Sequence, residues 1–115
     1  MIPMILNIFT WFRLKRLASR RSKKEALDSF VQRLAAFDRK RVESVYSDMQ
    51  KELILVGHFP ILPEDRLFED LEVDQGNLEV FFEERVPRQH LGTQSSVRTC
   101  ADLADYVLSR SNPKT

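Results

Sequence analysis

Residues 67–86 read LFEDLEVDQGNLEVFFEERV, a stretch that passes from an acidic loop into a helix. Beyond Gln75 the apolar residues recur at helical spacing, and charged residues fill the positions between them. The apolar side consists of Leu78, Phe81, Phe82 and Val86. Pro87 follows, and proline cannot continue a helix. We therefore predict an amphipathic helix that begins after Gln75 and directs Glu79, Glu83 and Glu84 away from its apolar side.

The same spacing predicts helices on the N-terminal side of this stretch. From about Ser22 the apolar series is Leu27, Phe30, Val31 and Leu34, and it resumes as Val42, Val45, Tyr46, Met49 and Leu53. The segment between the two series, AAFDRKR, contains neither proline nor glycine. This predicts either one long helix or two helices with a break near Asp38. Gly57, Pro60 and Pro63 then indicate a loop.

A last helix is predicted near the C-terminus. Residues 88–96, RQHLGTQSS, read as a loop, and Thr99 with Asp102 has the spacing of a capping box. No segment alternates with period two for long enough to predict a strand, so we expect an all-α protein. The tail, residues 111–115, is expected to fray. The predicted core contains Leu53, Phe68, Leu71, Leu78, Phe81, Phe82, Leu103, Tyr106 and Val107.

The composition limits the kinds of site that the chain can hold. The only cysteine, Cys100, excludes a disulfide framework and fits a small buried side chain. Three glycines in the whole chain exclude a glycine-rich phosphate loop, and neither His58 nor His90 has a partner at metal-ligand spacing. With no nucleophile and base in a recognisable pattern, we expect no enzyme, no cofactor, no metal and no small-molecule substrate.

Charge divides the chain into a basic beginning and an acidic remainder. No acid precedes Glu25, whereas the rest of the chain has 11 bases against 17 acids, a net charge of −6. The bases of residues 1–24, with the aromatic Trp11, predict contact with RNA, an anionic membrane or an acidic protein groove. These candidate contact residues are Trp11, Arg13, Lys15, Arg16, Arg20, Arg21, Lys23 and Lys24.

The first twelve residues, MIPMILNIFTWF, are apolar but too short to span a bilayer. A secretory signal has its charges before the apolar run, and here they follow it. An acid-free, Arg-rich leader is closer to a mitochondrial transit peptide, which predicts a mitochondrial location, with the cytoplasm as the alternative. A retained arm that docks on a partner is the other interpretation of residues 1–24.

Residues 40–109 resemble the acyl carrier protein family in three segments that occur in the family's order. These are the amphipathic RVESVYSDMQKELILV, the loop LPEDRLFEDLEVD and the final VRTCADLADYVLS. The most specific positions are Phe68, Asp70, Leu71 and Asp74. The resemblance implies an acyl-carrier-like helical bundle over residues 40–110. An extension helix (residues 25–39) and the basic segment (residues 1–24) precede the bundle.

The chain departs from that family at the attachment site of the prosthetic group. The family has Ser after the aspartate, and its hydroxyl carries 4′-phosphopantetheine. Here Asp74 is followed by Gln75, an amide that cannot form the phosphodiester, and no Ser or Thr lies between Ser47 and Thr93. We therefore expect no phosphopantetheine on this chain.

In the family, partner proteins recognise the acidic second helix. The resemblance implies the same for Glu69, Asp70, Glu72, Asp74, Glu79, Glu83 and Glu84. We thus expect a non-catalytic adaptor or structural subunit that binds basic helical proteins in a multi-subunit, mitochondrial assembly. The alternatives are an acyl carrier in fatty-acid metabolism and a small RNA-associated protein of a ribonucleoprotein that binds by its basic segment. A plain solvated acidic helix face is the simplest interpretation of the acids.

Overall fold

The structure is a computed structural model that describes residues 3–86 and 97–110. Its helices are α1 (Pro3–Ser19), α2 (Lys23–Arg33), α3 (Arg39–Glu52), α4 (Gln75–Arg85) and α5 (Cys100–Arg110). The described ranges contain no β-strand, only an isolated bridge between Arg66 and Thr99, so the all-α prediction is confirmed for them. The loop predicted over residues 88–96, which includes His90, and the tail 111–115 lie outside the described residues.

Residues 34–38 separate α2 from α3, which decides between the one-helix and two-helix alternatives. Leu34 is 6% exposed, and its backbone N–H donates to the carbonyls of Phe30 and Val31 at the end of α2. The turn brings α2 back along α3, so the rings of Phe30 and Tyr46 meet edge to face, with centroids 5.2 Å apart. In a continuous helix the same two residues would be about 24 Å apart along the axis. Burial of the Phe30 and Tyr46 rings against each other thus favours two helices over one continuous helix.

Side-chain caps fix the beginnings of α4 and α5. A carboxylate oxygen of Asp74 accepts a hydrogen bond from the backbone N–H of Asn77 at 3.0 Å. At α5, Thr99 Oγ1 accepts from the N–H of Asp102 and the Asp102 carboxylate accepts from the N–H of Thr99, both at 3.1 Å. The predicted capping box is confirmed.

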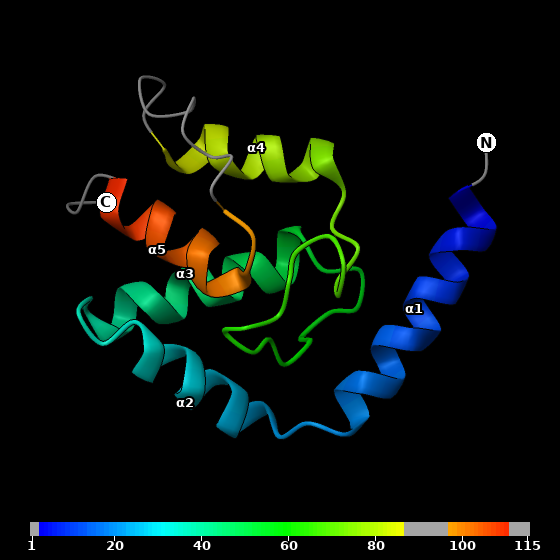
Figure 1. The fold of residues 1–115 in the computed structure, drawn as a ribbon, viewed down its shortest axis with the longest axis horizontal. Coiled ribbons are helices and arrows are strands. Elements are labelled where there is room, and N and C mark those ends of the chain that lie inside the picture. Colours follow the sequence, from blue (N-terminus) through cyan, green and yellow to red (C-terminus); the bar gives the residue numbers. More distant parts are fainter. Residues whose placement is uncertain (1–2, 87–96, 111–115) are drawn as a thin grey trace.

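The helices stack in an order that Figure 1 shows from the side. There α3 lies in the middle, with α2 on one side and α5 on the other, and α3 contacts both. The helix α4 runs above α5 and packs on it through Phe82, whose ring meets that of Tyr106 edge to face at 5.3 Å.

The segment between α3 and α4, residues 53–74, forms part of the core although it is not helical. Its backbone is fastened to the start of α5, because the N–H of Cys100 donates to the carbonyl of Asp65 at 2.8 Å and the N–H of Leu67 donates to that of Arg98 at 3.0 Å. It contributes the buried side chains Leu53, Ile54, Val56, Phe59, Ile61, Leu67, Leu71 and Val73. Cys100 itself is buried, as predicted, and burial raises the pKa of its thiol well above the usual value.

One of the nine core predictions is wrong. Phe68 is 41% exposed, and its neighbour Leu67 is the side chain that enters the core, with no exposed surface. Backbone hydrogen bonds explain why Leu67 and not Phe68 enters the core. The N–H of Leu67 donates to the carbonyl of Arg98, and the carbonyl of Leu67 accepts from the N–H of Val73. These bonds direct the Leu67 side chain inward and leave that of Phe68 on the outside of the turn. The other eight predicted core residues are buried: Leu53, Leu71, Leu78, Phe81, Phe82, Leu103, Tyr106 and Val107.

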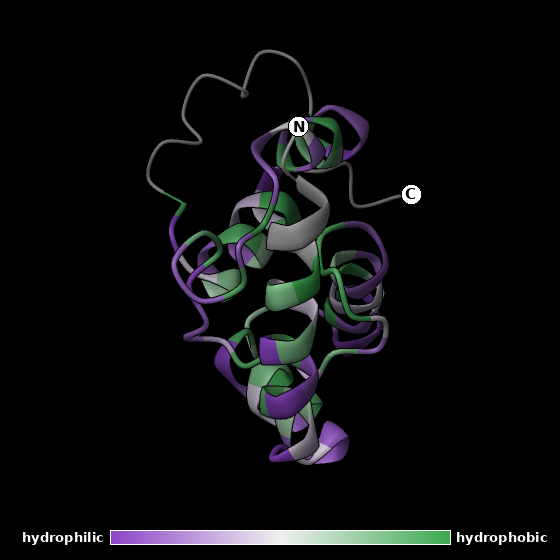
Figure 2. Ribbon diagram, turned by 90° about the vertical axis from the view of Figure 1, so that its right-hand side faces the viewer, coloured by the Kyte–Doolittle hydropathy of each residue, from purple (hydrophilic) through white to green (hydrophobic). Residues whose placement is uncertain are grey.

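The basic N-terminal segment is a helix that lies along one side of the molecule (Figure 1). Leu14 is fully buried in the common core, and Leu17 and Ala18 pack against that core. Viewed from the outside, α1 runs in front of the other elements (Figure 2). From Leu14 onward, the segment is therefore not a free arm.

Candidate protein-interaction surface

The seven predicted partner-binding acids do not form one helix face. Glu69, Asp70 and Glu72 lie in the segment before α4, Asp74 caps α4, and only Glu79, Glu83 and Glu84 belong to the helix itself. The structure therefore separates the acids into two groups: those that hold the chain together and those that face solvent.

Glu72 holds α1 against the body. One of its carboxylate oxygens accepts from Thr10 Oγ1 at 2.8 Å, and the other pairs with the Arg13 guanidinium, also at 2.8 Å. These hydrogen bonds, that of Thr10 first, lower the pKa of the Glu72 carboxyl. Glu72 has a positive φ of 52°, a strained conformation for a residue with a side chain, which is consistent with a position determined by tertiary contacts.

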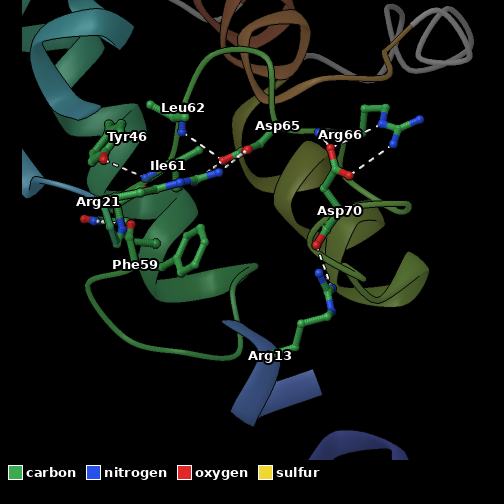
Figure 3. Close-up of polar contacts among 11 residues, drawn as sticks. Arg13, Arg21, Tyr46, Phe59, Ile61, Leu62, Asp65, Arg66 and Asp70 are labelled. Carbon is green, nitrogen blue, oxygen red and sulfur yellow. Dashed lines mark hydrogen bonds and ion pairs between the residues drawn. The ribbon is translucent and has the colours of Figure 1, made fainter. Parts of the chain in front are cut away.

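Asp70 is also engaged within the chain. Its carboxylate accepts from the backbone N–H of Arg66 at 2.9 Å and pairs with the Arg66 guanidinium, which lowers the pKa of Asp70. Its carbonyl accepts from Arg13 at 2.7 Å. Figure 3 shows Asp70 between these two arginines. Asp70 and Glu72 are therefore poor candidates for contact with a partner.

The outer face of α4 carries the free carboxylates. Glu83 makes no hydrogen bond or ion pair within residues 3–86 and 97–110, Glu79 accepts one weak bond of 3.3 Å from Gln75, and Glu84 pairs with Arg85 at 3.2 Å. Between them lies Val80, which is 50% exposed. The sequence analysis missed Val80. Val80 could have been noticed as an apolar residue that does not share the helical spacing of the buried Leu78, Phe81 and Phe82, and would therefore be exposed.

Arg85 fixes α4 on α3 so that this outer face has a defined orientation. Its guanidinium pairs with Glu52 and with Asp48, the latter at 3.2 Å, and lies 4.0 Å from the centroid of the Phe81 ring. Both acids belong to the last turns of α3, and of the α4 glutamates only Glu84 pairs with Arg85, so Arg85 leaves Glu79 and Glu83 available to other molecules.

Gln75 is the first residue of α4 and is exposed. Near it, an open cleft of about 540 Å³ lies between α1, the end of α3 and the start of α4. The cleft is lined by Thr10, Glu52, Leu53, Ile54, Leu55, Glu72, Asp74 and Asn77. Of these side chains, Thr10 and Glu72 are hydrogen-bonded to each other, and Asp74 caps α4.

The eight predicted contact residues of the basic segment divide in a similar way. Arg13 pairs with Glu72, and Arg21 pairs with the buried Asp65 (Figure 3), so both act inside the molecule. The remaining six are exposed: Trp11, Lys15, Arg16, Arg20, Lys23 and Lys24. None of these six pairs with an acid anywhere in the described ranges.

Among the described residues, no group of three or more His, Cys, Asp or Glu side chains could hold a metal ion. Over the same part of the chain, every helix is too short or too polar to cross a membrane. Comparison of the chain with protein-family models, with curated proteins and with solved structures found no match. The resemblance to acyl carrier proteins thus stays a hypothesis, which rests on the three segments of sequence.

Proposed function

We propose that the protein is a non-catalytic, acyl-carrier-like adaptor that binds a basic helical protein through the outer face of α4. The observation that carries this proposal is Val80, half exposed and flanked by Glu79, Glu83 and Glu84. An amphipathic partner helix would cover Val80 with an apolar side chain and place Lys or Arg opposite the glutamates.

The glutamate carboxylates and the apolar Val80 side chain have different roles in such a complex. An exposed ion pair contributes about 0–1 kcal/mol, so the carboxylates mainly orient the partner and speed the encounter. The apolar contact at Val80 supplies affinity by removing surface from water. Because Arg85 already holds α4 on α3, little ordering is needed when the partner binds.

Gln75 supports an adaptor over a carrier. It follows the capping Asp74 at the head of α4, the place where the family's serine would be, and its amide cannot take the prosthetic group. The acid-free leader supports a mitochondrial assembly as the setting.

Charge reversal on α4 tests the proposal. The full chain with Glu79→Lys and Glu83→Lys is compared with a matched control, Glu25→Lys with Asp105→Lys, which has the same net charge but alters exposed acids on α2 and α5. Each protein is purified from its native source with whatever it binds. We expect the α4 variant to lose the co-purifying partner and the control to keep it; equal recovery would reject the α4 surface.

A further inference from the structure

The outer face of α1 has an unusual concentration of apolar surface. Among residues 8–86 and 97–110, four of the seven exposed large hydrophobic side chains lie within residues 8–12. They are Ile8 (50% exposed), Phe9 (66%), Trp11 (39%) and Phe12 (56%). A contiguous patch of this kind marks a binding surface.

The opposite side of the same helix is already occupied. Thr10 and Leu14 are buried against the body, and Thr10 and Arg13 both bind Glu72. Because these contacts orient α1, the exposed apolar side chains of residues 8–12 face away from the body as a consequence of the fold.

Basic side chains follow the apolar patch along the helix. Lys15 and Arg16 on α1, and Arg20 just after it, are exposed, and no acid precedes Glu25. Lys15 lies at the boundary between the two zones, with its ammonium 5.2 Å from the centroid of the Trp11 ring. The order along α1 is therefore apolar and aromatic first, cationic second.

We propose that α1 is an interfacial membrane anchor that binds one leaflet of an anionic lipid bilayer. Such a helix lies in the plane of the membrane surface, with its apolar side chains in the acyl boundary, tryptophan at the interface and its basic side chains at the phosphates. With its outward side against the bilayer, α1 would place Ile8, Phe9 and Phe12 in the acyl boundary, to which interfacial helices sink by roughly 5–10 Å. The inference is independent of the adaptor function, since it rests on α1 alone.

The segregation of charge from aromatic residues favours lipid over RNA. A surface that binds single-stranded RNA interleaves Lys or Arg side chains with aromatic side chains, so that each nucleotide meets a positive charge at its phosphate and a ring at its nucleobase. Here residues 8–12 contain no base, and the exposed set includes the aliphatic Ile8, which cannot stack on a nucleobase. An acidic protein groove would match the bases but would leave the apolar patch uncovered.

Vesicle binding by the full chain tests this anchor. The vesicles consist of phosphatidylcholine alone or of its equimolar mixture with phosphatidylglycerol. Trp11 is the only tryptophan, so its emission reports on residues 8–12 directly. We expect co-sedimentation with the anionic vesicles and a blue shift of the emission. The neutral vesicles should bind about a hundredfold more weakly, since each of three bases contributes several-fold at an anionic surface.

Two variants separate the apolar from the cationic contribution. Phe9→Ser with Phe12→Ser should weaken binding to anionic vesicles about a hundredfold, because each ring loses about a factor of ten. Lys15→Glu with Arg16→Glu should remove the preference for anionic vesicles. The matched control is Leu55→Ser with Phe68→Ser, which deletes apolar side chains of similar exposure outside α1 and should bind as the parent does.

All altered side chains are exposed, and a melting curve for each variant confirms that it is folded. The anchor is overturned if the parent chain ignores both kinds of vesicle, or if the two α1 variants bind as well as the control. It is also overturned if the parent dimerises without lipid and Phe9→Ser with Phe12→Ser makes it monomeric, since a second copy would then cover the patch. Binding of single-stranded RNA in place of vesicles would overturn it in favour of a nucleic-acid surface.

Discussion

Arg21 and Asp65 form a two-pronged ion pair in which one guanidinium nitrogen lies 2.8 Å and the other 2.9 Å from the carboxylate oxygens. The pair is nearly buried, with side-chain exposures of 16% and 6%. Asp65 also accepts from the N–H of Leu62, and Arg21 donates to the carbonyl of Pro60 (Figure 3). This pair joins the end of the N-terminal segment to the non-helical part of the core.

Removal of one partner of this pair should destabilise the whole fold. For Asp65→Ala we expect a loss of about 3–5 kcal/mol in the free energy of unfolding, because the buried Arg21 charge remains without a counter-ion. Urea denaturation measures the loss. The control, Arg39→Ala, breaks exposed pairs with Asp28 and Glu43 and should change stability little. Equal losses would show that burial does not matter at Asp65.

Phe81 should be among the most costly core residues to truncate. It has no exposed surface, and its ring also supports the Arg85 guanidinium. We expect Phe81→Ala to cost about 3–5 kcal/mol, a large share of the stability of a domain this small. Val80→Ala, one residue away on the exposed side, should leave the melting temperature nearly unchanged. A small effect at Phe81 would mean that the orientation of α4 is wrong.

The contact between α1 and the body should weaken in acid. Folding lowers the pKa of Glu72 from its usual 4.5. The ionised Glu72 therefore contributes its full stabilisation to the fold above pH 4.5, and this contribution is lost as the pH falls through the lower pKa of the folded state. The difference in melting temperature between the parent and Glu72→Gln should therefore be largest near neutral pH and shrink in acid. A difference that grows on acidification would contradict the ion pair with Arg13.

The capping box at α5 should contribute a measurable amount to stability. Thr99→Ala removes the acceptor for the N–H of Asp102, and loss of such a cap costs about 1 kcal/mol. Chemical denaturation gives the value. Ser44→Ala, an exposed hydroxyl within α3, serves as the comparison and should be neutral. If both substitutions are neutral, the cap does not form in solution.

Introducing a serine at position 75 tests the resemblance to acyl carrier proteins. Gln75→Ser places a hydroxyl directly after the capping Asp74 on an exposed first turn, without disturbing the core. With a phosphopantetheinyl transferase and labelled coenzyme A, we expect label on Gln75→Ser and none on the parent chain. Label on the parent would make it a carrier, whereas failure of the variant would weaken the resemblance itself.

Much of the helical architecture could be predicted from local sequence. The spacing of Leu78, Phe81 and Phe82 identified the buried side of α4, and Thr99 with Asp102 identified the start of α5, because a helix is determined by contacts within a few residues. The prediction that Phe68 lies in the core was wrong because local sequence does not determine its orientation. Phe68 lies in a turn, where no periodicity exists, and its orientation depends on the bond from Leu67 to the distant Arg98.

The candidate sites were predictable only in part. Sequence identified the acids and the bases, but it could not show that Arg13 and Glu72, 59 residues apart, neutralise each other. It also gave no reason to single out Val80, since an exposed apolar side chain is recognised only when the buried face of its helix is known.

By itself, the amino-acid sequence determined where α4 and α5 begin, which sides of the helices from α2 onward are apolar, and that the bases precede the acids. The tertiary structure alone decided which charges remain available to other molecules. The reason is physical: periodicity and capping act over a few residues, whereas an ion pair such as Arg21 with Asp65, 44 residues apart, exists only after the chain has closed on itself. Folding occupies two of the basic segment's arginines and leaves its aromatic patch and remaining bases on the surface.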